Sequence, residues 1–158
     1  MIRVHSSRFF IYRLFQFIEV VQLTIKNETP GSSPLTVAIA GAFVIAGAMG
    51  IGRFAYTPLL PGLQETLGWT VAQACDVASA NYLGYMLGAM LAATLVHRPQ
   101  RYSGLLAGMI LSCATTLACA WITSYPLWLG VRFLSGVASA FCLILCTAIV
   151  IELAVRHH

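Results

Sequence analysis

Residues 126–151 read PLWLGVRFLSGVASAFCLILCTAIVI, an apolar run that contains one charged residue, Arg132. A helix of about 20 residues crosses the roughly 30 Å hydrocarbon core of a bilayer, because each residue adds about 1.5 Å. Three further apolar runs occupy residues 36–59, 73–96 and 104–123. The sequence therefore predicts an all-α protein, an integral membrane helical bundle with four transmembrane helices.

Composition supports a membrane protein over a water-soluble one. Hydrophobic residues make up 59% of the 158-residue chain and charged residues 9%, whereas soluble domains carry about 25% charged residues. The mean hydropathy is +0.83. A net charge of +4 could suit an acidic partner, but the basic residues are better explained by membrane topology, so no nucleic-acid partner is expected.

The chain divides into an N-terminal arm with a linker, residues 1–34, and a four-helix transmembrane domain, residues 35–158. Polar residues recur every three positions from Arg13 to Gln22 and leave about half of a helix circumference apolar. This pattern favours a helix that lies in the membrane interface. A signal peptide is disfavoured because no small-residue cleavage site follows, and upstream sequence read from a wrong start codon is an alternative origin of the arm.

Short connections at residues 60–72, 97–103 and 124–126 predict that successive helices run antiparallel. Seven Lys and Arg residues lie in the arm, the middle connection and the C-terminal tail, and none lies in the other two connections. Because basic flanks stay on the cytoplasmic side, both termini are expected on the cytoplasmic side of a bacterial-type inner membrane.

Two arginines fall inside the predicted spans. A charged side chain in the hydrocarbon costs at least about 2.5–3.5 kcal/mol unless it meets water or a partner. Arg53 and Arg132 lie at similar depth, about 8 and 9 Å from the outer ends of the first and fourth helices. Tyr56 shares a face with Arg53, Ser135 shares a face with Arg132, and Asn81 lies on the second helix. These five residues are the predicted substrate-binding residues.

The two arginines and Asn81 also have a purely structural interpretation. Arginines can clamp carbonyl groups or extend to the interface, and Asn81 can hydrogen-bond between helices. Asp76, near the outer end of the second span, could reach one of the arginines. If it does not, an anionic ligand is the obvious missing partner. Polar residues that continue the face of Arg132 suggest the wall of a polar cavity, namely Ser139, Cys142 and Cys146.

Other features indicate packing. Small residues recur at four-residue spacing and let helices approach closely: Ala80, Gly84, Gly88 and Ala92 on the second span, and Gly104, Gly108 and Ser112 on the third. The five cysteines show no metal-ligand or C-x-x-C spacing and are interpreted as small apolar residues. No metal, cofactor or enzymatic activity is expected, because no nucleophile motif or carboxylate pair is present.

Residues 50–61, GIGRFAYTPLLP, closely resemble the first-helix signature of the YbfB/YjiJ-type branch of the major facilitator superfamily. Residues 93–101 are similar to the cytoplasmic G-x-L-a-D-r-x-G-r element of that superfamily. His97 replaces the acid there and Gln100 the second glycine, which puts the usual charged latch between helices in question. Residues 132–140 resemble the fourth-helix R-x-x-q-G-x-g-a-a element, with serine in place of glutamine.

The resemblance covers about residues 35–152 and implies an alternating-access carrier of twelve helices in two halves, with helices one and four lining the path. It implies transport of a small solute, which the two arginines suggest is anionic. The chain is then expected to be a truncated N-terminal part of such a carrier. Its expected partners are the lipid bilayer, the small-molecule substrate, and either the missing C-terminal helices or a second copy.

Two other functions remain open. A four-helix carrier that works as a dimer would resemble the small multidrug-resistance exporters, but those carry a membrane-embedded glutamate where this first helix carries Arg53. A non-transporting membrane scaffold would not need two buried arginines.

Overall fold

The computed structural model describes residues 56–95 and 97–156 and, before them, residues 39, 41–43, 45–47 and 50. Regular structure in residues 56–156 is entirely helical and follows this order: α3 Tyr56–Leu67, α4 Val71–Ala93, α5 Arg98–Ala118 and α6 Tyr125–Arg156. The predicted all-α class is therefore confirmed for the described part of the chain. The predicted arm, residues 1–34, and Arg53 lie outside the described residues.

Helix α3 corrects one expectation. The sequence predicts that the first apolar run ends at residue 59 and that residues 60–72 form a connection, but α3, Tyr56–Leu67, continues through Pro58 and Pro61 to Leu67. Pro61 lies inside the helix, where its fixed φ still fits helical geometry although one hydrogen bond is lost. The helix ends before Gly68, whose φ of 66° suits a residue without a side chain.

Helix α4 begins with a capping box. The side chain of Thr70 accepts a hydrogen bond from the backbone N–H of Gln73, at 3.2 Å. The Gln73 side chain accepts one from the backbone N–H of Thr70, at 3.0 Å. Two amides at the helix end are thereby satisfied. The connection between α3 and α4 is therefore a short turn, much shorter than the loop predicted from the sequence.

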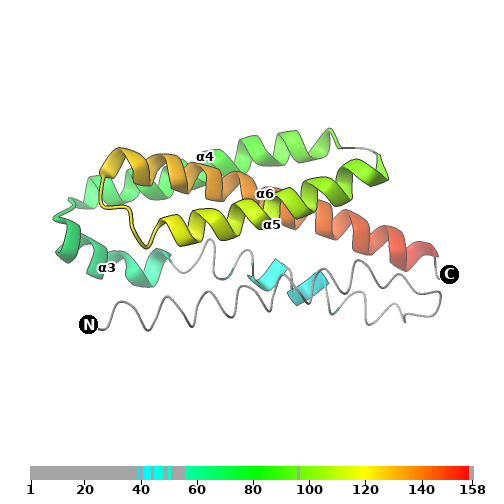
Figure 1. Cartoon of the computed structure of the whole chain (residues 1–158), viewed down its shortest axis with the longest axis horizontal. Coiled ribbons are helices and arrows are strands. Elements are labelled where there is room, and N and C mark those ends of the chain that lie inside the picture. Colours follow the sequence, from blue (N-terminus) through cyan, green and yellow to red (C-terminus); the bar gives the residue numbers. More distant parts are fainter. Residues whose placement is uncertain are drawn as a thin grey trace.

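Helix α6 is the central element, and both α4 and α5 pack against it (Figure 1). A side chain added at Gly84 would meet the carbonyl of Phe133, and one at Gly88 would lie 2.8 Å from the Cα atom of Val137. On α5, a side chain at Gly108 would lie 2.8 Å from the Cβ atom of Phe141. The small residues predicted to be packing surfaces thus do allow close contact between helices.

The order of these contacts fixes the helix directions. Gly84 and Gly88 of α4 face Phe133 and Val137 of α6 in that order, so α4 and α6 are parallel. Contacts of α5 with α6 run in the reverse order, so α5 is antiparallel to α6. The thiol of Cys146 donates a hydrogen bond to the carbonyl of Gly41, at 3.7 Å, whereas Tyr56 contacts the opposite end of α6. Gly41 and Tyr56 of the first predicted span therefore contact α6 in the reverse of their sequence order, as expected for an antiparallel neighbour.

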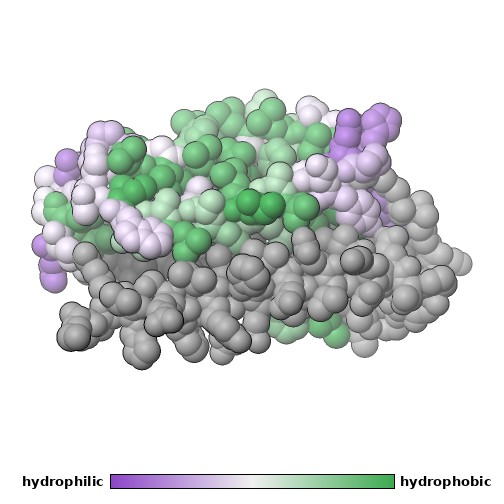
Figure 2. Space-filling view, in the orientation of Figure 1, coloured by the Kyte–Doolittle hydropathy of each residue, from purple (hydrophilic) through white to green (hydrophobic). Residues whose placement is uncertain are grey.

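Apolar side chains cover the middle of the described surface and polar ones gather at its two ends (Figure 2). Large apolar side chains of α4 are 40–64% exposed: Tyr82, Leu83, Met86, Leu87, Met90 and Leu91. In the described part, one helical segment, Tyr125–Glu152, is long and apolar enough by itself to cross a membrane. Helix α4 overlaps most of the second predicted span, residues 73–96. Helix α5 begins at Arg98 and ends at Ala118, so it includes most of the predicted 97–103 connection and stops short of the predicted end at residue 123. That the two helices cross the membrane stays a prediction.

Candidate functional site

Arg132 lies on α6 about two turns after the helix begins at Tyr125. Its side chain is buried, with 7% of its surface exposed. The residue falls within the segment Tyr125–Glu152 that can span a membrane. A permanently charged guanidinium is therefore held inside the most apolar helix of the described chain, where burying a charge is costly.

The ring of Tyr56 lies against this guanidinium. The central carbon of the Arg132 guanidinium is 4.4 Å from the centre of the Tyr56 ring, which is within the range of a cation–π interaction. Tyr56 is the first residue of α3 and is 7% exposed. Its hydroxyl donates a hydrogen bond to the carbonyl of Ala74 on α4, at 3.1 Å. One side chain thus joins α3 to both α4 and α6.

Three more aromatic residues, Trp69, Tyr125 and Trp128, form with Tyr56 a group that we call the aromatic cluster. The Trp69 and Trp128 rings meet edge to face with centres 5.4 Å apart, and Trp69 and Tyr125 do so at 6.0 Å. The Tyr56 and Trp128 ring centres are 6.4 Å apart. The Trp128 indole N–H donates to the carbonyl of Ile122, at 2.9 Å. The sequence analysis missed this cluster, although aromatic residues near the ends of apolar runs are a known interfacial signal.

Asn81 and Ser135 lie beside Arg132 in the packed interface between α4 and α6. The Asn81 side-chain amide donates a hydrogen bond to the backbone carbonyl of Arg132, at 2.9 Å. Asn81 and Ser135 are each 3% exposed. This contact supports the packing role considered for Asn81. The structure therefore brings together four of the five predicted site residues, and their binding of a substrate stays a prediction.

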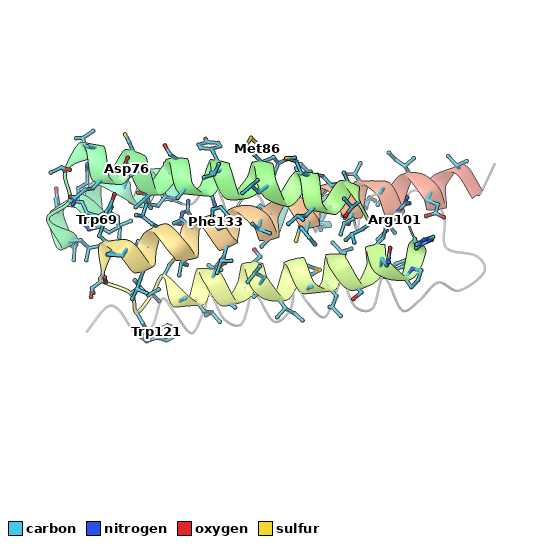
Figure 3. All side chains as sticks on the ribbon, turned by 90° about the horizontal axis from the view of Figure 1, so that it is seen from above. Trp69, Asp76, Met86, Arg101, Trp121 and Phe133 are labelled. Atoms are coloured by element: carbon cyan, nitrogen blue, oxygen red, sulfur yellow. The ribbon has the colours of Figure 1, made fainter. Side chains whose placement is uncertain are left out.

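Asp76, which the sequence suggested could reach one of the two arginines, pairs with Tyr125. Its carboxylate accepts a hydrogen bond from the Tyr125 hydroxyl, at 2.9 Å. Asp76 and Trp69 lie at one end of the bundle, which we call the Trp69 end, and Arg101 lies at the other (Figure 3). The Asp76–Tyr125 bond therefore links the start of α6 to α4 at the Trp69 end.

The face that continues from Arg132 along α6 is a packing surface in this structure. Ser139 and Cys142 have no exposed surface, and Cys146 is 4% exposed. The Ser139 hydroxyl donates to the backbone carbonyl of Ser135 within the same helix, at 2.8 Å. These three residues therefore pack inside the described bundle, where the sequence had predicted the wall of a polar cavity.

At the other end of the bundle, Arg101 connects α5 to α6. Its guanidinium lies 3.5 Å from the carboxylate of Glu152, and the two side chains are 26% and 29% exposed. The Arg101 Nε–H also donates to the carbonyl of Leu95, at 3.2 Å. The sequence analysis assigned no role to Glu152, because sequence spacing does not show which turn of α6 faces Arg101.

Comparison with known proteins identifies the family. A family model described as "Uncharacterised MFS-type transporter YbfB" matches residues 45–158. The chain belongs to this family. It is also 33% identical over 93 residues to a protein of Streptomyces lividans named "Chloramphenicol resistance protein". That match covers 59% of this chain and 24% of the relative, so the chain spans about a quarter of the relative's length. No solved structure matches.

Family membership places the chain in the YbfB-type branch of the major facilitator superfamily, as the resemblance implied. The match includes Arg53, the aromatic cluster and Arg132. The candidate site residues and the aromatic cluster therefore lie within the part of the chain that the family model matches.

Proposed function

We propose that this chain acts in a secondary carrier that moves a small anionic solute across a bacterial-type inner membrane. The observation that carries the proposal is Arg132, a cation that is 7% exposed within the apolar segment Tyr125–Glu152. Attraction between opposite charges is several-fold stronger in a poorly hydrated site than in bulk water. A guanidinium can also hold a carboxylate or a phosphate through two parallel hydrogen bonds.

The proposed anion site combines residues from the first, second and fourth helices of the carrier. Arg53 is expected one turn before Tyr56 on the same helix face, and the Tyr56 ring contacts the Arg132 guanidinium. Ser135 adds a hydroxyl near Arg132. Asn81 holds the Arg132 backbone by its hydrogen bond, so its contribution to the site is to fix α6.

Further helices must complete the translocation path, since alternating access requires one repeat to move against another. They come either from the same polypeptide or from a second copy of this chain. The broad apolar face of α4, which is exposed in this structure, is available to contact lipid or those helices. Both termini of the chain are proposed to be cytoplasmic.

A neutral solute is the second candidate, because the Streptomyces lividans relative is named for chloramphenicol resistance. An uncharged aromatic solute would gain little from Arg132 and more from aromatic side chains. The charge of the transported solute therefore separates the two candidates.

The test is solute uptake into vesicles that contain a full-length carrier bearing this sequence. We expect uptake of a labelled carboxylate, with unlabelled carboxylates and phosphates competing for it. Arg132→Lys should lower this uptake at least about tenfold, because Lys cannot form the two parallel hydrogen bonds. Arg13→Lys, in the N-terminal arm and outside the residues that match the family model, is the control and should leave uptake unchanged. Immunoblots of the membrane fraction verify equal amounts of protein. Normal uptake in Arg132→Lys, or competition by chloramphenicol alone, would contradict an anion site.

A further inference from the structure

The Tyr56 ring is held in place by several neighbours at once. Its hydroxyl bonds to the Ala74 carbonyl, and the Trp128 ring packs beside it with ring centres 6.4 Å apart. Trp128 is in turn packed edge to face on Trp69. Tyr56, Trp69 and Trp128 are each at most 8% exposed. A ring so enclosed has little freedom to move.

The three aromatic residues come from different elements. Tyr56 starts α3, Trp69 lies in the turn before α4, and Trp128 lies in the first turn of α6. The position of the Tyr56 ring is therefore set by the packing of the whole Trp69 end and not by α3 alone. Arg132, one turn further along α6, contacts the face of that ring.

A fixed ring face has a direct consequence for a long, flexible side chain. An arginine side chain has many rotamers, and a side chain that is ordered in advance loses less conformational entropy when a ligand binds. The cation–π contact uses the ring face, whereas a carboxylate or phosphate is gripped through guanidinium N–H groups. Contact with the ring and binding of an anion are therefore compatible.

We infer that Tyr56 is a positioning residue for Arg132, and that Trp69 and Trp128 act through it. The ring face of Tyr56, rather than its hydroxyl, holds the guanidinium in the orientation that receives an anion. The inference rests on the proposed function and assigns a task to the aromatic cluster, which would otherwise be a packing group at the end of the bundle.

The position of Arg132 can be read directly in the full chain by NMR of ¹⁵N-labelled arginine in detergent micelles. The Nε–H signal of Arg132 is assigned by its loss in Arg132→Lys. Ring currents should shift this signal in the wild type. Tyr56→Phe keeps the ring and should keep the shift, while Tyr56→Leu and Trp128→Leu should reduce it. Trp121→Leu is the matched control, because Trp121 is 71% exposed and lies outside the aromatic cluster.

The anion step is tested on the same samples with inorganic phosphate and acetate as probes. Both should perturb the Arg132 signal, and Tyr56→Leu should raise the half-saturating concentration about tenfold, whereas Tyr56→Phe should change it less than about twofold. Binding that is unchanged in Tyr56→Leu would overturn the inference and leave the proposed function standing. Failure of both anions to affect Arg132 in the wild type would instead overturn the proposed function and this inference with it. If Tyr56→Leu does not fold, loss of the ring-current shift in Tyr56→Phe would by itself overturn the assignment to the ring.

Discussion

Gly84 and Gly136 lie where the backbones of α4 and α6 meet. A side chain at Gly84 would collide with the Phe133 carbonyl, and one at Gly136 would collide with the carbonyl of Asn81. Backbone atoms cannot move aside as a flexible side chain can, so even a methyl group is expected to push the helices apart. Gly130 on α6 differs, because nothing lies within 4 Å of the corresponding position.

We predict opposite effects for the same substitution at these positions. Gly84→Ala should lower the free energy of unfolding by about 1–3 kcal/mol through overpacking. Gly130→Ala should raise it by up to about 1 kcal/mol, because alanine has the higher helix propensity. Unfolding in detergent followed by circular dichroism measures both changes. A stabilised Gly84→Ala protein would show that α4 and α6 are not in close contact in the folded protein.

The pair Arg101 and Glu152 gives a second prediction at the residue scale. Arg101→Glu should destabilise the contact between α5 and α6 by placing two carboxylates together, and the double variant Arg101→Glu/Glu152→Arg should recover part of the loss. The pair is partly exposed at 26% and 29%, so the coupling energy should be about 0.5–1 kcal/mol. A double-mutant cycle of unfolding free energies measures it. Additive effects of the two substitutions would mean that the side chains do not interact.

At the scale of elements, the turn between α3 and α4 is well defined. Gly68 ends α3 with a positive φ, and the Thr70 capping box begins α4. Together they place Trp69 within the aromatic cluster, against Trp128 and Tyr125. The local chemistry of the turn therefore supports the packing that surrounds Tyr56.

Loss of the cap should be measurable. Thr70→Ala removes the acceptor for the Gln73 amide and should cost about 1 kcal/mol of stability. Thr123→Ala is the matched control, because Thr123 is exposed in the connection between α5 and α6. Thermal unfolding of the two variants gives the comparison. Equal stability of the two would indicate that the start of α4 is held by tertiary packing alone.

On the scale of the whole molecule, the described surface in Figure 2 is apolar in the middle and polar at its two ends. The Trp69 end and the Arg101 end lie far apart along the helices (Figure 3). The asymmetry of basic residues predicts that the Arg101 end faces the cytoplasm. The connection between α5 and α6 should then face the opposite side of the membrane.

Cysteine labelling tests this orientation. In a background with Cys75→Ala, which removes an exposed thiol, we expect Thr123→Cys to react with a membrane-impermeant maleimide in intact cells. His97→Cys should react after the cells are opened. Both positions are exposed, so a difference in labelling reports the side of the membrane. Labelling of His97→Cys in intact cells would reverse the predicted topology.

The sequence by itself determined that the chain forms apolar helices, roughly where α4, α5 and α6 lie, and that their small residues are packing surfaces. These properties are local, because run length and residue spacing record helix length and helix face. It also singled out Arg132, since a charge in an apolar run is visible without any partner. The path of α3 through Pro61 was not predictable, because the surrounding packing offsets the lost hydrogen bond.

Which residues meet was decided by the tertiary structure. Asp76 bonds to Tyr125 across 49 positions, and Arg101 reaches Glu152 across 51. Tyr56, Trp69 and Trp128 come from three elements, and their cluster, which places the Tyr56 ring against Arg132, exists only once those elements pack together. Helical periodicity places a side chain on a face of its own helix, but the rotation and offset of the neighbouring helix select its partner. That rotation and offset depend on how all the side chains at the interface fit together, so no single stretch of sequence records them.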